Sequence, residues 1–343
     1  MNKVSIIIPH YNNYSIINQC LKSLLEINYK NIEIIIIDNN SSDDSFLKIK
    51  NNYNNIILKK SHKNLGYAGG CNLGASFASG DYLLFLNNDT VHSKNFLNHL
   101  VATLDKDKNI ASVPPKIKNL NRKDFFDYAG ASGGYIDYLV FPFCRGRIFD
   151  TLEKDTSQYD ENSNVFWTSG TAFLTRKSLF MKMNGFDQKL FAHMEEIDYC
   201  WKCNLSNYVC VVNPSAVIYH EGAKTLSYNS PMKTYLNHRN SLILLLTNYQ
   251  FLTVIKVLPL RIILEIISSF RELLNFRFLH FIAHYLSLAS IFNFFYLLKR
   301  RRYINNIRVV GDEYLFKNNL IFSKSIIFEY FLKRKIFFKD LFD

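Results

Sequence analysis

The chain has 343 residues, of which 48% are hydrophobic and 20% charged. A length above the ~250–300 residues that one core usually covers predicts a main domain with an additional region. The net charge of +12 is concentrated in residues 249–343, which hold 15 Lys or Arg against 7 Asp or Glu. A basic excess confined to this region suits an anionic membrane surface or nucleic acid better than a basic active-site groove.

Cysteine usage indicates a reducing compartment. Cys200 and Cys203 have the spacing of half a zinc site, but no second pair follows. We therefore expect free thiols in a cytoplasmic protein. The first apolar run ends at Pro9, and we expect no signal peptide. The six cysteines are Cys20, Cys71, Cys144, Cys200, Cys203 and Cys210.

The first 90 residues alternate between short apolar runs and helical segments. Strands are predicted at residues 4–8, 34–37, 56–58 and 82–86, where apolar runs are bounded by polar residues. Helices are predicted at residues 15–25, with Ser15 as N-cap, and at residues 71–78. This alternation predicts an α/β fold with a mainly parallel central sheet and right-handed crossovers.

Acidic residues stand at the ends of two predicted strands. Asp38 ends the second strand, and Asp89 follows the fourth after Asn87 and Asn88. Ligands of open α/β sheets bind at the carboxyl ends of strands, so Asp89 is placed to reach a ligand or a metal. Asp38 can accept a hydrogen bond from a ring N–H, such as N3 of uracil or thymine. A turn at residues 87–89 and a helix cap at Asp38 are the structural alternatives.

Glycines cluster between the third and fourth predicted strands, but they do not form a dinucleotide fingerprint. They follow the third strand rather than the first, and their spacing is not that of the tight turn. Gly69 and Gly70 either allow a diphosphate to approach a helix N-terminus or allow close packing of the helix on the sheet. Both interpretations stay open. The glycines are Gly66, Gly69, Gly70 and Gly74.

Residues 115–163 are polar, aromatic and turn-rich, without clear periodicity. Loops of that length are usually functional or disordered, and we assign this region to acceptor binding. Further strands are predicted at residues 166–174, 209–212 and 216–219. His220 ends the last of these, where a neutral imidazole can bind a transition metal or serve a purely structural role.

Three acids follow one another closely at a predicted helix start. The helix dipole favours Glu195, Glu196 and Asp198 there without any further function. Glu195 and Asp198 share a helix face, whereas Glu196 points elsewhere. Carboxylates this close raise one another's pKa, which can produce a base poised near neutrality.

These motifs, in this order, resemble the inverting family-2 glycosyltransferases of GT-A fold, particularly bacterial rhamnosyltransferase-like members. Each motif is weak alone, but the ordered set is specific and covers residues 3–245. The motifs lie at residues 4–12, 37–43, 64–70, 80–90, 169–173, 185–187 and 195–198, followed by His220, Tyr235 and residues 238–240.

The resemblance implies a role for each matching residue. Asp89 and His220 would hold Mg²⁺ or Mn²⁺ on the donor diphosphate. Glu196 would be the catalytic base, with Glu195 and Asp198 as neighbouring acids or acceptor contacts. Trp167, Gly170 and Thr171 would contact the acceptor or the donor sugar. Asp38 would hold the pyrimidine between Pro9 and Tyr11, and the implied nucleotide-binding set is Pro9, Tyr11, Asn12, Asp38, Asn40, Asn64, Gly66, Gly69 and Asn88.

Two residues depart from the family pattern. Asn87 stands where many members have a first metal-binding Asp, and Glu196 stands where the base is usually Asp. The first departure leaves open a non-catalytic, membrane-bound partner subunit. A nucleotidyltransferase is disfavoured, because the Gly-rich loop with a following Arg is absent after residues 4–8.

The C-terminal region is expected to associate with a membrane. Residues 278–298 carry no formal charge and are long enough to span a bilayer. However, His280, His284, Ser287, Ser290 and Asn293 form a polar stripe, and residues 299–302 are basic. This pattern favours an amphipathic helix in the interface over a spanning helix, and burial inside the protein is a third interpretation.

The resulting prediction is an inverting, metal-dependent glycosyltransferase. Residues 1–245 would form a GT-A catalytic domain, and residues 246–343 a helical, membrane-associating region. It would move rhamnose from dTDP-rhamnose to a cell-surface glycan or lipid-linked saccharide. A UDP-linked galactosyl, galactofuranosyl or glucosyl donor is the alternative. We expect a peripheral position on the cytoplasmic face of the plasma membrane and no nucleic-acid partner, while homo-oligomerisation stays open.

Overall fold

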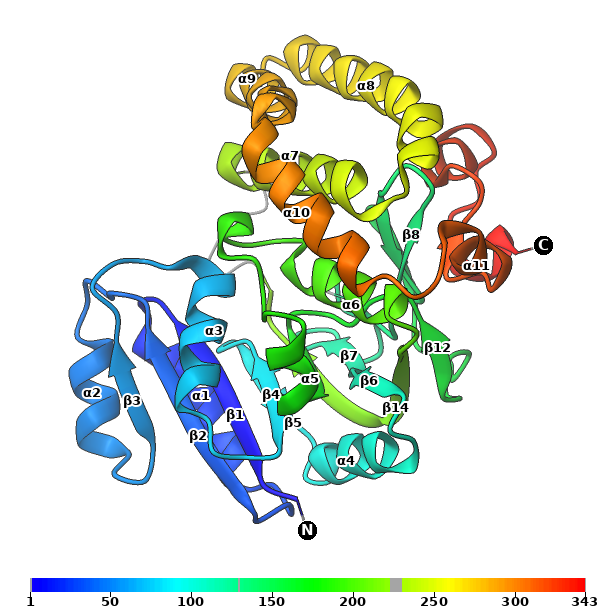
Figure 1. Cartoon of the computed structure of the whole chain (residues 1–343). Helices are drawn as coiled ribbons and strands as arrows, with labels where there is room; N and C mark the ends of the chain where they lie inside the picture. Colours follow the sequence, from blue (N-terminus) through cyan, green and yellow to red (C-terminus); the bar gives the residue numbers. More distant parts are fainter. Residues whose placement is uncertain (1, 129, 223–229, 343) are drawn as a thin grey trace.

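The computed structural model describes residues 2–128, 130–222 and 230–342 (Figure 1). Its main feature is a ten-stranded mixed sheet, in which eight strands follow one another in the order β12-β14-β6-β13-β4-β1-β2-β3 and two more pair with β14. The strands are β1 (Val4–His10), β2 (Ile32–Asp38), β3 (Ile57–Lys60), β4 (Tyr82–Leu86), β5 (Thr90–His92), β6 (Ile110–Val113), β7 (Pro115–Asn119), β12 (Ser163–Val165), β13 (Ala172–Arg176) and β14 (Val209–His220).

The N-terminal half of the sheet is parallel, as predicted. β1 pairs in parallel with β2 and β4, and β2 pairs in parallel with β3. Alternate side chains of β1 enter two different cores. Ile6 and Ile8 pack with α1 (Tyr14–Leu25) and α4 (Phe96–Lys106), whereas Ile7 packs with α3 (Gly66–Phe77). The predicted α/β class with a mainly parallel central sheet is therefore confirmed.

Two helix starts differ from the prediction. α1 begins at Tyr14, and its N-cap position is Asn13 rather than Ser15. α3 begins at Gly66 instead of residue 71, so the clustered glycines form its first turns rather than a loop. Glycine at position 74 allows α3 to lie close to the sheet, since a Cβ there would lie 2.3 Å from Cγ2 of Ile7. The other helices before residue 206 are α2 (Ser45–Asn52), α5 (Lys177–Lys182) and α6 (Glu195–Leu205).

Residues 115–163 contain regular structure, so their prediction as a long loop is wrong. They supply β7, the first residue of β12 and four strands of a second, five-stranded sheet. Its strands have only two to four residues each, too short to leave a visible period in the sequence. They are β8 (Gly134–Asp137), β9 (Pro142–Cys144), β10 (Arg147–Ile148), β11 (Thr151–Leu152) and β15 (Ile321–Phe322), and β15 pairs in parallel with β8.

The C-terminal helices share a buried core with the central sheet. The predicted boundary between residues 245 and 246 falls inside α7, and Leu245, Val254 and Ile304 share one buried core with Phe85 of β4. Figure 1 shows α8 and α9 at the end of the molecule opposite the N-terminus. The helices are α7 (Pro231–Asn248), α8 (Phe251–Leu274), α9 (Phe278–Ala289), α10 (Phe294–Ile307) and α11 (Asp312–Lys317).

α8 and α9 are amphipathic with their polar sides turned inward. On α9 the predicted stripe is present, but His284 and Ser287 are buried, and Ser287 donates to the carbonyl oxygen of Tyr235 at 3.0 Å. The opposite sides of these helices are apolar and exposed. The exposed side chains are Ile263, Ile266, Ile267, Phe270 and Leu274 on α8, with Phe278, Leu279, Ile282 and Leu286 on α9. We call these nine residues the apolar helix face.

The predicted helix over residues 278–298 is broken. α9 and α10 meet at a bend of 68°. Among the described residues no single helix has the length and apolar character to cross a membrane, although this bent pair has both when taken together.

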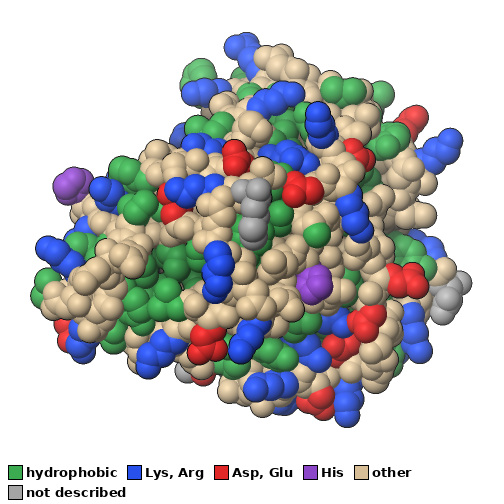
Figure 2. Space-filling view, turned by 90° about the horizontal axis from the view of Figure 1, so that it is seen from below, with side chains coloured by type: hydrophobic (Ala, Val, Ile, Leu, Met, Phe, Trp, Pro, Cys, Tyr) green, Lys and Arg blue, Asp and Glu red, His purple; other side chains and the backbone are tan. Residues whose placement is uncertain are grey.

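Charges are mixed on one further face of the molecule. On the face seen in Figure 2, Lys and Arg side chains lie scattered among Asp and Glu side chains, without one large basic patch.

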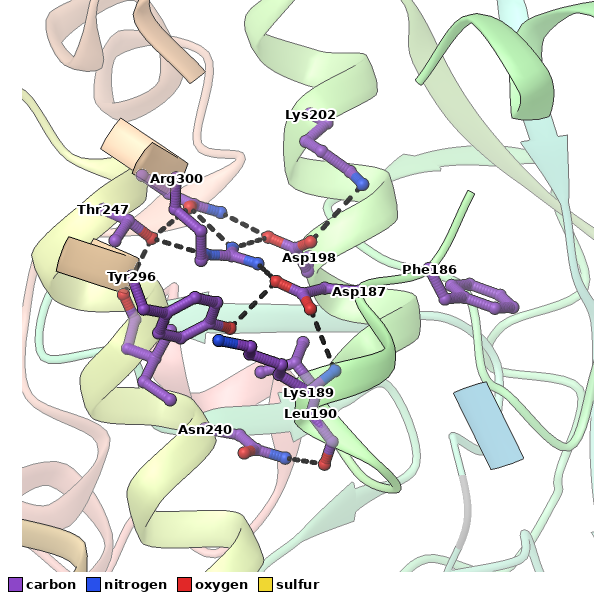
Figure 3. A network of polar contacts seen from close by, with 12 residues as sticks. Phe186, Asp187, Lys189, Leu190, Asp198, Lys202, Asn240, Thr247, Tyr296 and Arg300 are labelled. Atoms are coloured by element: carbon purple, nitrogen blue, oxygen red, sulfur yellow. Dashed lines mark hydrogen bonds and ion pairs between the residues drawn. The ribbon is translucent and has the colours of Figure 1, made fainter. Parts of the chain in front are cut away.

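Asp198 anchors α10 to α6 instead of facing a ligand. Figure 3 shows its carboxylate beside the Arg300 guanidinium, with an NH2–Oδ1 distance of 2.6 Å. Arg300 also pairs with Asp187, and Lys202 approaches Asp198 at 3.4 Å. Burial alone would raise the pKa of Asp198, but Arg300 and Lys202 lower it to about 2. This corrects the predicted contact of Asp198 with an acceptor.

Replacing Arg300 by Met should destabilise the protein strongly. Asp198 is fully buried and would lose its main counter-ion, a change that typically costs about 3–5 kcal/mol. Chemical denaturation followed by circular dichroism measures the loss. Lys299→Met is the matched control, because Lys299 is exposed on the same helix. A loss below about 1 kcal/mol for Arg300→Met, the usual worth of a surface pair, would contradict this role.

Candidate active site

A cavity of about 1200 Å³ lies at the carboxyl ends of β1 and β4. Pro9 and Tyr11 border it at the end of β1, and Asn87 to Asp89 border it after β4. It then continues past Glu196 to α7, α8 and residues 327–332. The strand ends are thus at the cavity wall, as expected for an open α/β sheet.

The first part of the cavity gathers most of the predicted nucleotide-binding residues. Its wall includes Pro9, Tyr11, Asn64, Gly66 and Asn88. His10 and Asn39 also line it, although the sequence analysis did not select them. The Nδ2 of Asn39 lies 3.1 Å from the carbonyl oxygen of Gly66, and Nδ1 of His10 lies 2.9 Å from Nδ2 of Asn88. Each of the two lies at a strand end, next to a residue that was predicted to bind the nucleotide. This position was the sequence signal that could have identified them.

Asp38 lies just behind this wall and is fully buried. Its Oδ2 accepts a hydrogen bond from the Ser41 N–H at 3.2 Å. Its Oδ1 has no hydrogen-bond partner within the described part of the chain. A buried acceptor without a partner is costly, so this oxygen fits the predicted hydrogen bond to a base. Burial lowers the pKa of the adjacent His10 to about 4, although Asp38 opposes that shift.

Besides Asp38, three other predicted nucleotide-binding residues are not part of the cavity wall. Asn12 ties two loops together, since its Oδ1 accepts from the Ser42 N–H at 2.8 Å. Asn40 adopts a φ of +64°, as turn residues do. At Gly69 a Cβ would lie 2.7 Å from Cβ of Leu65, the N-cap residue of the same helix. This contact does not decide between packing on the sheet and approach of a diphosphate, so both interpretations of Gly69 stay open.

Asp89 and His220 meet at the ends of β4 and β14. Oδ1 of Asp89 lies 3.1 Å from Nε2 of His220, and both side chains are nearly buried. The other ring nitrogen of His220 lies 2.8 Å from Oδ1 of Asp127. Burial alone would lower the pKa of His220, but Asp89 and Asp127 raise it to about 10.

This arrangement fits a divalent cation. Two ligands at about 2.1 Å from one ion and at right angles to each other are roughly 3 Å apart. The Asp89–His220 separation of 3.1 Å matches that spacing. Asp127 would orient His220 through the second ring nitrogen, as carboxylates do at metal-bound histidines. Asp127 was missed from the sequence because it lies in the region without periodicity.

Glu195 and Glu196 line the same cavity as Asp89, and Glu195 is buried whereas Glu196 is partly buried. Burial, and then the charge of Glu196, raise the pKa of Glu195 well above its usual range. Burial also raises the pKa of Glu196 to about 7, although the Gly170 N–H opposes the shift. Two carboxyls whose pKa values are pushed apart suit a neutral donor and an ionised base. Oε2 of Glu196 has no hydrogen-bond partner among the described residues.

The residues predicted to contact a sugar also line the cavity. Trp167, Gly170 and Thr171 line it close to Glu196. The indole N–H of Trp167 donates to the carbonyl oxygen of Tyr135 at 2.8 Å, which fixes the ring against the second sheet. Substituting Gly170 would place a Cβ 3.6 Å from the carboxyl carbon of Glu196, so glycine keeps this approach open.

Within the described residues, a second group of ligand-type atoms joins α7, α8 and α9. His238, Glu265 and His284 have such atoms within 4.8 Å of one another. Arg261 already pairs with Glu265, at 2.7 Å from NH2 to Oε1. A guanidinium next to the only carboxylate disfavours a cation. We interpret this cluster as a buried network that holds the three helices together.

The fold and the cavity define a class of α/β proteins that bind a nucleotide at the carboxyl edge of the sheet and a metal beside it. Residues 5–183 match the family model described as Glycosyl transferase family 2. This is more than half of the chain, and the chain therefore belongs to glycosyltransferase family 2.

Relatives support this family at modest identity. Glycosyltransferase GlyG of Streptococcus pneumoniae is 26% identical over 53% of this chain and 59% of its own length. An N-acetylglucosaminyl-diphospho-decaprenol L-rhamnosyltransferase of Mycobacterium tuberculosis is 22% identical over 66% of this chain and 78% of its own. A poly-beta-1,6-N-acetyl-D-glucosamine synthase of Staphylococcus aureus is 27% identical over 65% and 51%, respectively. The chain thus spans little more than half of some curated relatives.

Solved structures confirm the fold. The structure of GalNAc-T7 with UDP, GalNAc and Mn²⁺ superposes with a TM-score of 0.58 at 16% identity, covering 71% of this chain and 48% of that one. The mannosyltransferase PcManGT from Pyrobaculum calidifontis, in complex with GDP-Man and Mn²⁺, gives 0.50 at 13% identity, covering 84% and 86%. These likenesses establish the predicted GT-A fold.

Proposed function

We propose that this chain transfers a sugar from a nucleotide diphosphate to a hydroxyl of a glycan or lipid-linked saccharide, with inversion. The observation that carries the proposal is the position of Glu196 in the same cavity wall as Asp89 and His220. A single displacement at an anomeric carbon needs a base for the attacking hydroxyl and a metal ion for the leaving group. Residues suited to both roles line this cavity.

Each group has one task in this reaction. Asp89 and His220 would hold Mg²⁺ or Mn²⁺, which neutralises charge on the departing diphosphate. Ionised Glu196 takes the proton of the attacking hydroxyl as the new glycosidic bond forms. Protonated Glu195 donates a hydrogen bond to Glu196, which stabilises the negative charge of the Glu196 carboxylate. One base on the face opposite the leaving group gives inversion.

For the donor we propose dTDP-rhamnose, with a UDP-sugar as the alternative. The family resemblance and the name of the mycobacterial relative support rhamnose. The name of the staphylococcal synthase favours an N-acetylglucosamine donor instead. Thermal-shift titrations with dTDP-rhamnose, UDP-glucose, UDP-galactose and UDP-N-acetylglucosamine, each with Mn²⁺ or with chelator, separate them. We expect the largest metal-dependent rise in Tm with dTDP-rhamnose; a larger rise with a UDP-sugar would reassign the donor.

A non-catalytic partner subunit is the alternative class, because Asn87 replaces an acidic ligand. Turnover decides between the two. Release of free nucleotide diphosphate from the donor, with acceptor present, supports an enzyme. Metal-dependent donor binding without any release would support the partner subunit.

We further propose that the apolar helix face rests on the cytoplasmic surface of a membrane. Residues 1–245 would then carry catalysis, and residues 246–343 would supply the docking surface. The nine side chains of the apolar helix face are exposed on α8 and α9, while polar side chains of the same helices are buried. Exposed apolar areas of this kind mark interaction sites, and the basic excess of residues 249–343 selects an anionic lipid surface.

Vesicle flotation tests this surface. Full-length protein should float with vesicles that contain anionic phosphatidylglycerol. Phe270→Ser together with Leu279→Ser should weaken binding by about 10²-fold or more, because each buried apolar side chain contributes about 1.5–3 kcal/mol. Leu25→Ser with Leu47→Ser is the matched control, since both leucines are exposed on α1 and α2. Equal flotation of the two double variants would contradict the proposed face.

A further inference from the structure

Asn240 belongs to the last motif of the family pattern but lies outside the cavity wall. It is fully buried on α7. Its side chain faces residues 190–194, which lead directly into α6 and the two glutamates, and Figure 3 shows the amide directed at the Leu190 carbonyl oxygen. We call residues 190–194 the lead-in segment.

The backbone of the lead-in segment is strained. Phe191 has a φ of +65° and a ψ of −63°, and the Ala192 N–H donates to the Leu190 carbonyl oxygen at 2.8 Å. Together these features define a γ-turn of the rare, strained form. His193 and Met194 are left-handed as well, with φ values of +67° and +71°. Such a run of non-glycine residues persists only where neighbouring groups over-determine the backbone.

Asn240 supplies this constraint. Its Nδ2 donates to the carbonyl oxygens of Leu190, Ala192 and His193 at 2.9, 3.0 and 2.6 Å, respectively. Nε of Arg239 donates to Oδ1 of Asn240 at 2.9 Å, which leaves Nδ2 as the atom that faces the three carbonyls. One amide group thus holds carbonyls on both sides of the γ-turn.

The lead-in segment sets where α6 begins. Met194 is the N-cap residue of α6, and its carbonyl oxygen accepts from the Asp198 N–H at 2.8 Å. Burial raises the pKa of Glu196, and the N–H groups of Glu196 and Ile197 in the first turn oppose this rise by donating to the carboxylate. If Met194 returned to the extended conformation usual for an N-cap, the first turn would point elsewhere and the carboxylate would lose these donors.

The opposite side of the lead-in segment is held by α3. The carbonyl oxygen of Phe191 accepts from the Ala68 N–H at 3.1 Å. A Cβ at Gly66 would lie 2.6 Å from Cδ2 of Phe191, so glycine at this position admits the Phe191 ring. The nucleotide side of the cavity is therefore joined to the segment by contacts that Asn240 does not make.

We propose that Asn240 is a positioning residue for the catalytic base. By holding the lead-in segment in its left-handed conformation, Asn240 directs the Glu196 carboxylate into the cavity. This rests on the proposed function, in which Glu196 takes the proton of the attacking hydroxyl. Asn240 acts only through the backbone of residues 190–194. A residue that served packing alone would not need an amide, because a leucine of similar size fills the same space.

Hydrogen exchange on the full-length protein tests the backbone part of the proposal. Asn240→Leu keeps the side-chain volume but removes the N–H donors. Followed by peptide mass spectrometry, exchange at residues 190–198 should become at least about tenfold faster than in the wild type, because the segment opens locally. Asn213→Leu is the matched control, since Asn213 is buried outside the cavity wall and its Nδ2 donates to the His99 carbonyl oxygen at 3.1 Å. The control should leave exchange at residues 190–198 unchanged.

Kinetics test the link to the base. Turnover is measured as nucleotide diphosphate released to water from the nucleotide sugar that binds best among the four named above, so no acceptor has to be known. Asn240→Leu should lower kcat by about 10- to 100-fold, because a displacement of about 1 Å can cost a catalytic group ~10²-fold. Affinity for UDP with Mn²⁺ should change less than about threefold, since α3 still holds the nucleotide side. Asn213→Leu should change neither quantity.

A second variant covers the case in which Asn240→Leu does not fold, which thermal melting detects. Arg239→Met removes the bond to Oδ1 of Asn240 and the bonds from the guanidinium to the carbonyl oxygens of Lys189 and Leu190. It should give the same pattern with a smaller loss, because Asn240 still holds the segment.

Three results would overturn the proposal. Unchanged exchange at residues 190–198 would show that the lead-in segment does not need the amide. A kcat close to that of the wild type would show that the base does not depend on the segment. An equal loss of UDP affinity would assign Asn240 to the donor site. If the wild-type protein releases no nucleotide diphosphate from any of the four sugars, the proposed function fails, and hydrogen exchange still decides whether Asn240 holds the segment.

Discussion

Glu196→Gln should reduce turnover by about 10²–10⁴, the usual worth of general base catalysis, while donor affinity stays nearly unchanged. Glutamine keeps the size and hydrogen bonding of the side chain but cannot take a proton. Steady-state kinetics measure the turnover, and titration of the donor measures affinity. Glu26→Gln, the same change at an exposed position of the chain, is the control.

The neighbouring acid provides a sharper comparison. Glutamine resembles a protonated carboxyl, which is the form that burial and Glu196 favour for Glu195. Glu195→Gln should therefore retain most of the turnover. If Glu195→Gln is inactive while Glu196→Gln is not, the roles of the two residues are exchanged.

The pH profile follows from the same pair. Because the base works only when ionised and its pKa is raised to about 7, kcat/KM should fall as the pH decreases through about 7. A rate that is constant between pH 5.5 and 8 would contradict Glu196 as base.

Asp89→Ala should abolish metal-dependent binding of the nucleotide donor. The loss should exceed the 10–100-fold expected for Asp127→Asn, which removes only the orienting partner of His220. Titration of UDP with and without Mn²⁺ measures both effects separately from activity. Asp124→Ala is a suitable control, because Asp124 is an exposed partner of Lys154. Conversely, Asn87→Asp should tighten metal binding by adding an anionic ligand. Full activity of the wild-type protein in excess chelator would exclude a metal-dependent mechanism.

The sequence predicted the parts of this molecule that are encoded locally. The strand ending at Leu86 and the acid Asp89 after it stand out because a buried strand leaves an uninterrupted apolar run. The family motifs added roles for Glu196 and His220, which no local pattern could assign.

Features that depend on distant contacts were not predictable. Asp127 acts through His220, which lies far away along the chain, and the two-residue strands around Arg147 have no period. The sequence predicted the polar stripe of α9, but it did not predict that this stripe faces the protein interior. Amphipathicity alone does not say whether water or protein meets the polar side, and here His284 meets Glu265 at 2.9 Å.

The pairing of β15 with β8 has a consequence for biosynthesis. The strands that border the nucleotide leave the ribosome first, and N-terminal units generally fold first. The cavity wall includes Phe328, Phe331 and Leu332, which follow the strand formed by Ile321 and Phe322 in the second sheet and leave the ribosome near the end of synthesis. The strand ends that border the cavity can therefore form well before the cavity wall is complete. Premature release from the ribosome would leave these strand ends without the wall that residues 327–332 supply.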